Sequence, residues 1–144
     1  MSNLYKELKN NHSKEVNNFP MMFAFSQEQF NEGMDKLGLL PTETDKIFSI
    51  GMGGYIKKCD SKQLDEMTTR HETEFNDNIK NDLTGDNFIY DMFHYELCNH
   101  EYGYTYEIED TLDSLDMTME SINSNPALIH GLYKATQDIK QEDN

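Results

Sequence analysis

The chain has 144 residues, of which 27 are acidic and 12 basic, and its formal charge is −15. That excess disfavours direct binding to nucleic acid or to an anionic membrane, because both need lysine and arginine side chains to neutralise their phosphates. No signal peptide or long apolar run is present, and two cysteines make no disulfide framework, so we expect a cytoplasmic protein. We also expect a single domain over residues 1–144, with a frayed tail at about 141–144.

The N-terminal part of the sequence predicts a helix followed by a strand. Leucine, valine and phenylalanine side chains spaced along residues 4–19 favour a helix that ends at Pro20. The short apolar run at residues 21–25 predicts a buried strand. The first helix and the first strand are therefore separated only by the proline.

A capped helix and a hairpin follow. Ser26 begins the helix, Gln29 stands at the spacing of a capping box, and Gly38 occupies the C-terminal end. The glycine-rich turn at 51–54, between two short β-prone runs, predicts a hairpin over residues 47–58. We therefore expect an α+β fold, a mainly helical single domain with a small antiparallel sheet around this hairpin.

Two longer helices are predicted next. Asp60 can cap a helix over about residues 61–80, and a second helix over 87–101 has so wide an apolar surface that we expect it at the centre of the domain. We place Cys98 on that apolar face, because a small buried thiol is common there. The inward-facing residues of the first helix are Leu64, Met67, His71, Phe75 and Ile79.

Three tyrosines follow the central helix. Gly103 interrupts the helical pattern, and Tyr102, Tyr104 and Tyr106 alternate around it. Side chains of an extended backbone point alternately to opposite faces. If this stretch is extended, its three rings therefore point to one side.

The C-terminal part predicts further helices. An amphipathic stripe over residues 112–122 favours one helix, unless Thr118 caps a new short helix and splits it. Asn125 is an N-cap followed by Pro126 at the first helical position, and this pair opens a last helix that runs to about Ile139.

Residues 81–133 carry no lysine or arginine but eleven carboxylates. Such one-signed charge opposes the compact state by self-repulsion and projects a strong negative field. Within the run, four acids follow a 4-3-4 spacing and would fall within about 60° of one another on a continuous helix. These acids are Glu109, Asp113, Asp116 and Glu120.

An acidic ridge beside aromatic rings can imitate a nucleic-acid strand, with carboxylates in place of phosphates and rings in place of bases. The alternative is a solvated face on an acidic protein. On the first interpretation the surface binds a basic protein groove and not nucleic acid itself. The predicted partner-binding residues are Glu101, Tyr102, Tyr104, Tyr106, Glu107, Glu109, Asp110, Asp113, Asp116 and Glu120.

His94, Cys98 and His100 resemble a metal-binding cluster. His94 and Cys98 are four residues apart and can share one helical face. His100 lies about 200° around the helix from Cys98, so one helix cannot direct it at the same ion. We predict no metal and no cofactor.

No motif for catalysis is present. The serines lack a nucleophile-elbow context, and Cys59 has no base nearby in the sequence. The glycine turn before Lys57 and Lys58 could cradle a phosphate, but no helix N-terminus follows it at once. We predict no enzymatic activity and no catalytic residue.

Three stretches, residues 23–39, 50–58 and 84–102, resemble a family of small acidic proteins carried by phages and mobile elements of Firmicutes. The resemblance spans about residues 4–133 and brings no catalytic motif. It implies a glycine at the place of Asp116, which would favour a helix break there. It also implies location in a host bacterial cell and a role in inhibiting bacterial immunity, by similarity in size and charge to anti-CRISPR and anti-restriction proteins.

The leading hypothesis is a phage or mobile-element inhibitor of a host nucleic-acid-handling defence system, a CRISPR effector or another nuclease. Two alternatives stay open: a non-catalytic adaptor or regulator of a mobile element, and a binding protein or enzyme for a small nucleotide signal. The lack of lysine and arginine in the aromatic-rich region counts against the latter. A pocket that places Lys57, Lys58 or Arg70 beside tyrosines would favour it.

Overall fold

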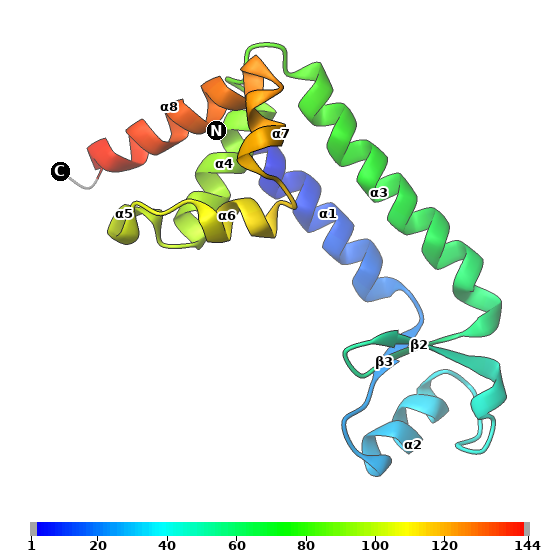
Figure 1. Ribbon diagram of the computed structural model, residues 1–144. Coiled ribbons are helices and arrows are strands. Elements are labelled where there is room, and N and C mark those ends of the chain that lie inside the picture. Colours follow the sequence, from blue (N-terminus) through cyan, green and yellow to red (C-terminus); the bar gives the residue numbers. More distant parts are fainter. Residues whose placement is uncertain (1–2, 143–144) are drawn as a thin grey trace. The chain divides into compact units, whose positions relative to one another are not determined.

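In the computed structural model, which describes residues 3–142, the chain has the expected α+β fold, mainly helical with a small antiparallel sheet (Figure 1). It divides into two compact units. We call Met1–Ser13 together with Thr73–Asn144 the helical unit, and Lys14–Glu72 the sheet unit, and each is described by itself. That residues 1–144 form one domain stays a prediction.

The element bounds agree with most of the predicted ones. The helices are α1 (Leu4–Asn18), α2 (Gln27–Lys36), α3 (Ser61–Asn81), α4 (Phe88–Asn99), α5 (Tyr102–Thr105), α6 (Glu109–Ser114), α7 (Met119–Asn123) and α8 (Pro126–Glu142). The strands are β1 (Met21–Phe23), β2 (Ile47–Gly51) and β3 (Gly54–Lys57), and two 3-10 turns are η1 (Thr44–Lys46) and η2 (Lys58–Asp60). Helices α1 and α3 each begin in one unit and end in the other.

The last helix, α8, begins where the sequence predicts and ends later than expected. Asn125 caps α8 as predicted, because its side-chain oxygen accepts a hydrogen bond from the N–H of Ala127 at 2.9 Å. The helix continues to Glu142, past the predicted end at Ile139, and residues 143–144 of the expected frayed tail lie outside the described residues.

Across residues 3–142, no helix combines the length and apolarity needed to cross a membrane.

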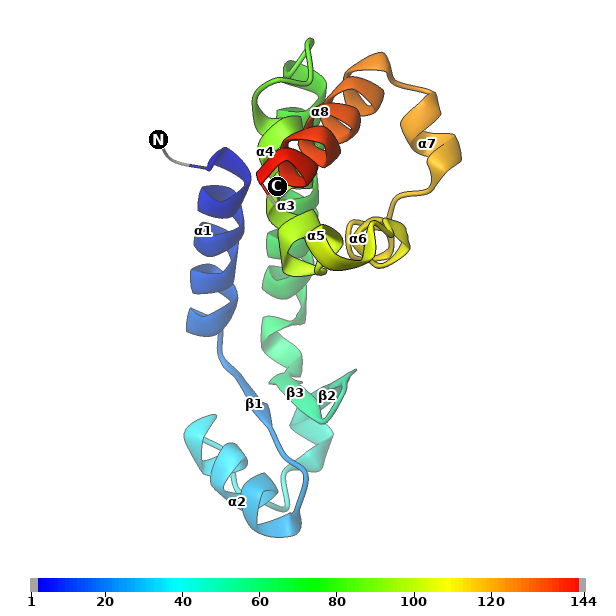
Figure 2. The ribbon, with the colours of Figure 1, turned by 90° about the vertical axis from the view of Figure 1, so that its left-hand side faces the viewer.

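In the sheet unit, α2 packs against a three-stranded antiparallel sheet of order β1-β3-β2, as Figure 2 shows. The buried side chains between them are Met22, Met34, Leu37 and Ile47. The predicted strand at residues 21–25 is shorter than expected, and its burial was wrong. Only Met22 of this stretch is buried, whereas Phe23 and Phe25 are exposed, because an edge strand of three residues covers little of either ring.

Side-chain and glycine caps fix both ends of α2. The Ser26 hydroxyl accepts a hydrogen bond from the N–H of Gln29 at 3.1 Å, which confirms the predicted N-cap. Gly38 has a φ of +77°, and the N–H groups of Gly38 and Leu39 donate to carbonyls of the last turn, which is the hydrogen-bond pattern of a Schellman motif. In the predicted hairpin, Met52 and Gly53 both have positive φ, as a type I′ turn requires.

The inward stripe predicted for α3 is confirmed in its pattern. Helix α3 begins at Ser61, directly after Asp60, and the five predicted inward positions are half-buried while most of their neighbours are exposed. Two of them, Phe75 and Ile79, pack against the core of the helical unit. No residue of α3 is fully buried, so its sequence periodicity identifies a boundary helix rather than a core helix.

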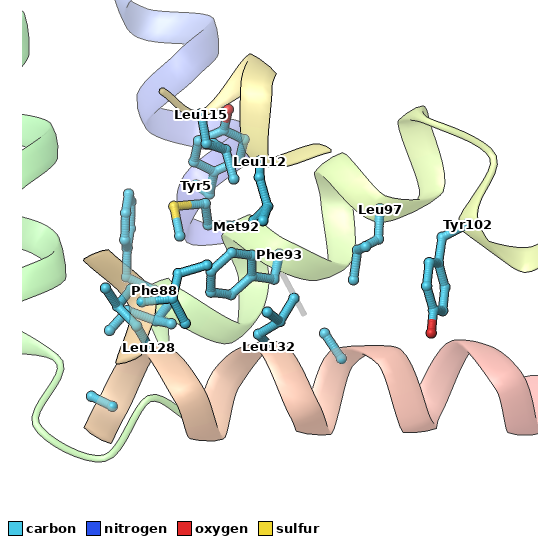
Figure 3. Close-up of a cluster of buried hydrophobic side chains, with 14 of the residues drawn as sticks. Tyr5, Phe88, Met92, Phe93, Leu97, Tyr102, Leu112, Leu115, Leu128 and Leu132 are labelled. Carbon is cyan, nitrogen blue, oxygen red and sulfur yellow. The ribbon is translucent and has the colours of Figure 1, made fainter. Parts of the chain in front are cut away.

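The helical unit is built on α4 and α8, which lie side by side and run in the same direction (Figure 3). As predicted, α4 is the central helix, with buried side chains at half of its positions. Its rings and aliphatic side chains meet those of α8 and of the shorter helices α5, α6 and α7. The buried core consists of Tyr5, Phe88, Ile89, Met92, Phe93, Leu97, Tyr102, Leu112, Leu115, Ile122, Ala127, Leu128, Leu132, Ala135 and Ile139.

Two glycines allow the N-terminal ends of α4 and α8 to touch. A Cβ at Gly131 would lie 2.5 Å from Cγ2 of Ile89 and 2.9 Å from the carbonyl oxygen of Gly85. A Cβ at Gly85 would lie 2.1 Å from the carbonyl oxygen of Ala127, and its φ of +85° also favours glycine. The contact is therefore made by backbone, and no larger residue fits at either position without movement.

A ladder of polar pairs runs along the outer edge of the same two helices. The pairs are Asp86 with His130 and Lys134, Tyr90 with Asp138, and His94 with Glu142. Each pair advances by about one helical turn on both sides, which confirms that the helices are parallel. Hydrogen bonds donated by His130 and Lys134 hold the pKa of Asp86 below its usual value.

The turn that precedes α4 is organised by one buried carboxylate. Asp82 accepts hydrogen bonds from the N–H groups of Gly85, Asn87 and Ile89 at 2.9 to 3.0 Å. It takes the place of an N-cap side chain, since Asn87 itself makes no capping hydrogen bond. Asp82 thus fixes Gly85, which touches α8, and the first turn of α4 together.

A second buried carboxylate attaches α1 to α4. Glu96 is almost fully buried and accepts hydrogen bonds from the Tyr5 hydroxyl at 2.8 Å and from Nζ of Lys9 at 3.4 Å. Burial and the hydrogen bond to Glu96 raise the pKa of Tyr5 above its usual value, so the hydroxyl stays protonated as a donor. The Tyr5 ring lies against Phe88, Tyr95 and Phe75 in tilted or edge contacts.

The predicted burial of Cys98 was wrong. Its thiol is exposed, and the inner position in the last turn of α4 is taken by Glu96 and Leu97. One residue corresponds to about 100° of rotation, which carries Cys98 out of the buried stripe. The sequence pattern failed here because nothing in it indicates that an acid, Glu96, occupies the buried side.

We predict that Tyr5→Phe lowers the free energy of unfolding by about 1–3 kcal/mol, because it leaves a buried carboxylate with one hydrogen bond fewer. Tyr95→Phe is the matched control, since the hydroxyl of Tyr95 makes no hydrogen bond to any described residue, and it should change stability by less than about 0.5 kcal/mol. Urea denaturation measures both. Equal losses in the two variants would contradict the role given to the Tyr5–Glu96 hydrogen bond.

Candidate functional site

The predicted partner-binding residues lie in one segment, residues 101–120, which we call the acidic segment. It follows α4 and contains α5, α6 and the start of α7. Three of its residues, Glu101, Tyr106 and Asp116, have positive φ values of 61°, 57° and 55°. Non-glycine residues rarely adopt this conformation, and it is found most often at functional sites and tight turns.

The three tyrosine rings do not point to one side, because the extended stretch on which that expectation depended does not form. Residues 102–105 form the short helix α5 instead of an extended strand. Tyr102 is only 4% exposed and belongs to the core, Tyr104 is 91% exposed, and Tyr106 is 55% exposed. The chain turns at Glu101 and Tyr106 and not at Gly103, and no sequence pattern indicates the left-handed conformation of these two residues.

The acidic ridge is not continuous on one helix. Helix α6 ends at Ser114, and Asp116 takes the left-handed position of a Schellman motif, with Met117 donating to the carbonyl of Leu112 at 2.9 Å. Thr118 then caps α7 through reciprocal hydrogen bonds with Ser121. The split at Thr118 was an open alternative, and the break implied at Asp116 is present.

The break redistributes the four acids of the expected ridge. Glu109 and Asp113 remain four residues apart on α6, Asp116 lies in the turn, and Glu120 lies on α7. The 4-3-4 spacing could not reveal this, because Leu112, Leu115 and Ile122 are buried in the broken arrangement as they would be on one helix. The apolar stripe that favoured one continuous helix is therefore equally compatible with the two helices α6 and α7.

All seven carboxylates of the acidic segment are exposed, and none forms an ion pair with a described residue. They are Glu101, Glu107, Glu109, Asp110, Asp113, Asp116 and Glu120. Carboxylates elsewhere in the helical unit do have cationic partners, such as Asp86 with Lys134 and Glu96 with Lys9. The helical unit has five lysines and seventeen carboxylates, so cations are too few to compensate the charge of the segment.

An apolar groove of about 440 Å³ lies beside the acidic segment. Its floor is formed by the buried side chains of Tyr102, Ile122 and Leu132, and two carboxylates, Glu107 and Glu109, stand on its wall. The remaining lining residues are Tyr106, Ile108, Met119, Asn123, Ile129, Tyr133 and Thr136. Tyr106 and Tyr133 are more than half exposed, and Met119 and Ile129 are also exposed, so apolar surface and negative charge meet in one place.

Sequence reasoning identified only part of this groove. The wall contributed by α8, above all Ile129 and Tyr133, was missed, together with Met119 of α7. A signal for it existed: Ile129 and Tyr133 are four residues apart and lie beside, not within, the buried stripe that includes Leu128 and Leu132. Two large apolar residues on the outer face of an otherwise amphipathic helix indicate a surface that another molecule can cover.

One lysine already shows how the rings of this site can hold a cation. Nζ of Lys140 lies 5.4 Å from the centre of the Tyr106 ring, within the range of a cation–π contact. Tyr106 also stacks at an angle on Tyr102, which ties it to the core. A lysine or arginine from a partner could approach the exposed rings of Tyr104 or Tyr133 in the same manner.

The residues considered for a metal site do not gather around one point. Nδ1 of His94 lies 4.0 Å from the sulfur of Cys98, as their spacing predicts. His100 instead places Nδ1 2.8 Å from the carbonyl oxygen of Glu96. Within residues 3–142 no group of three histidine, cysteine, aspartate or glutamate side chains is arranged to hold an ion.

We predict that Asp116→Gly raises the free energy of unfolding by about 0.5–1 kcal/mol, because glycine occupies the left-handed position without strain. Asp113→Gly is the matched control: it removes the same charge, but from inside α6, and should lower stability by about 0.5–1 kcal/mol. Thermal and urea unfolding measure the difference. Two changes of the same sign would contradict the break at Asp116.

Comparison with known proteins places the chain in a family. No curated protein and no solved structure matches it. A family model matches residues 4–138, which include the acidic segment, the groove and the whole sheet unit. The match covers most of the chain, so the shared sequence pattern extends over both compact units. The chain therefore belongs to DUF7659, a family of unknown function.

Proposed function

We propose that this chain is a phage or mobile-element protein that inhibits a nucleic-acid-handling defence protein of a bacterial host by binding it stoichiometrically, without catalysis. Its target would be a CRISPR effector or another nuclease with a basic groove. The observation that carries the proposal is the acidic segment, whose seven exposed carboxylates have no cationic partner among the described residues. That charge is left available for a partner.

The charge of the acidic segment suits a basic groove better than any other partner class. Carboxylates repel nucleic acid and anionic lipid, and they attract surfaces rich in lysine and arginine. A field of one sign speeds the encounter and makes it sensitive to salt, but it adds little affinity by itself. An inhibitor of this kind therefore also needs anchor residues, which are large side chains that the partner buries on binding.

The groove beside the acidic segment supplies such anchors. Tyrosine is enriched among the residues that dominate binding energy, because its ring buries a large area and its hydroxyl still reaches a polar partner. Tyr106 and Tyr133 line the groove and Tyr104 stands free of it, all three more than half exposed. A basic side chain that enters the groove would meet Glu107 and Glu109 at the wall and apolar surface at the floor.

The strained turns support the same interpretation. Positive φ values at Glu101, Tyr106 and Asp116 each oppose folding by about 1 kcal/mol or more, and all three occur in the acidic segment. The segment also concentrates repulsive charge. Backbone strain and charge repulsion both oppose the folding of this segment, and binding of a partner to its shape and charge would explain why the segment has both.

The proposal predicts that Glu109→Lys/Asp113→Lys/Asp116→Lys abolishes partner binding. The measurement is capture from host lysate with tagged protein at low and moderate salt, followed by binding of the purified captured protein in competition with its own nucleic acid. We expect a nucleic-acid-binding protein that is released as salt rises and that loses its nucleic acid when this chain binds.

The matched control is Glu28→Lys/Glu32→Lys/Asp35→Lys, which changes the net charge equally on exposed positions of α2 in the sheet unit. This control should keep partner binding. If the triple change in the acidic segment leaves binding intact, or if both triple variants lose it equally, the acidic segment is not the binding surface.

A further inference from the structure

The sheet unit contains a pocket of about 520 Å³ that shares no lining residue with the groove of the helical unit. It is formed where α1 and α2 end and where β1 makes the edge of the sheet. Its volume falls within the range of small-molecule sites, about 300–1,000 Å³. The lining residues are Val16, Asn17, Asn18, Phe19, Pro20, Met21, Phe23, Lys36, Leu37 and Lys57.

The charge of this pocket is opposite to that of the chain. Two lysines, Lys36 and Lys57, line it and no carboxylate does, although the chain has 27 acidic residues. Neither lysine forms an ion pair within residues 3–142, whereas Lys46 of the same unit pairs with Glu43. Lys36 lies in the last turn of α2 and offsets the negative end of that helix, but Lys57 lies at the end of a strand and has no such role.

The remaining lining suits a ring and a polar head group. Phe19, Phe23 and Leu37 offer apolar surface, and Phe23 is more than half exposed, so a ring that covers it gains from burial. Asn17 and Asn18 offer side-chain amides on the rim, each able to donate two hydrogen bonds.

The edge of the sheet adds backbone donors. Ala24 donates to the carbonyl of Gly53 at 2.9 Å, and Met22 is opposite Tyr55, so these residues of the ladder face β3. In an antiparallel pair the intervening residues direct their N–H groups away from the partner strand. The N–H groups of Met21 and Phe23 therefore face the outer edge, where both residues line the pocket.

We infer that this pocket binds a small aromatic anion, with the anionic group at Lys36 and Lys57 and the ring against Phe19 and Phe23. The two lysines explain the sign of the charge, and the phenylalanines explain why a bare inorganic ion would bind more weakly. A nucleoside monophosphate and an aromatic sulfonate share this chemistry. No sequence pattern indicates this pocket, because Lys36 lies 21 residues before Lys57 and only the fold brings both to one place.

The test uses the full chain with four probes at constant ionic strength: adenosine monophosphate, adenosine, inorganic phosphate and anilinonaphthalene sulfonate. Calorimetry measures the first three and fluorescence the last. We expect one or both of the aromatic anions to bind at least tenfold more tightly than adenosine and phosphate. Whether the monophosphate or the sulfonate binds more tightly distinguishes a nucleotide from another aromatic acid as the natural ligand.

The variant Lys36→Gln/Lys57→Gln should weaken binding of the aromatic anion at least tenfold. The matched control Lys46→Gln/Lys62→Gln makes the same change of charge on the same unit, away from the pocket, and should leave binding within twofold. Failure of both aromatic anions to bind, or an equal loss in the two double variants, would overturn the inference. The result is independent of the acidic segment, whose partner binding the same lysine variants should leave unchanged.

Discussion

The structure of the helical unit depends on the close parallel contact between α4 and α8. Gly85 and Gly131 let the two backbones touch at one end, and the polar pairs from Asp86 to Glu142 hold the outer edge in register. The shorter helices then pack on this pair through Leu112, Leu115 and Ile122, and Figure 3 shows Leu112 and Leu115 above the side chains of α4. Without the glycines, α4 and α8 would separate and the floor of the groove would open.

This frame explains how the chain tolerates its acidic segment. Repulsion among seven exposed carboxylates opposes folding, but the segment is attached through buried apolar residues on both sides, from Tyr102 to Ile122. The core fixes the path of the backbone, and the charges are left at positions where solvent screens them. The buried acids Asp82 and Glu96 differ from these exposed carboxylates. Each accepts hydrogen bonds from several donors and stabilises the fold.

Most of the fold followed from the sequence because local signals and burial agreed. The caps at Ser26, Thr118 and Asn125, the glycine-rich hairpin turn and the apolar width of α4 were each readable from a few residues. The wrong predictions share one cause. Where the sequence was compatible with more than one local structure or buried face, contacts in the folded chain decided which one formed. The buried position of Glu96, which displaces Cys98 from the core, depends on Tyr5 and Lys9, which are distant from it in the chain. The candidate site was predicted in its charges but not in its shape, because a third of the residues that line the groove come from α8.

The central claim is that the acidic segment and its groove form one binding surface for a basic partner. The most direct test is an amide NMR titration of the chain with a short cationic peptide that contains leucine and arginine, at two salt concentrations. The account predicts shifts concentrated at residues 101–133, with Tyr106 and Tyr133 among the strongest, and weakening as salt rises. Shifts spread evenly over all exposed carboxylates, or concentrated on the acids of α2 and α3, would contradict it, because charge alone would then attract the peptide.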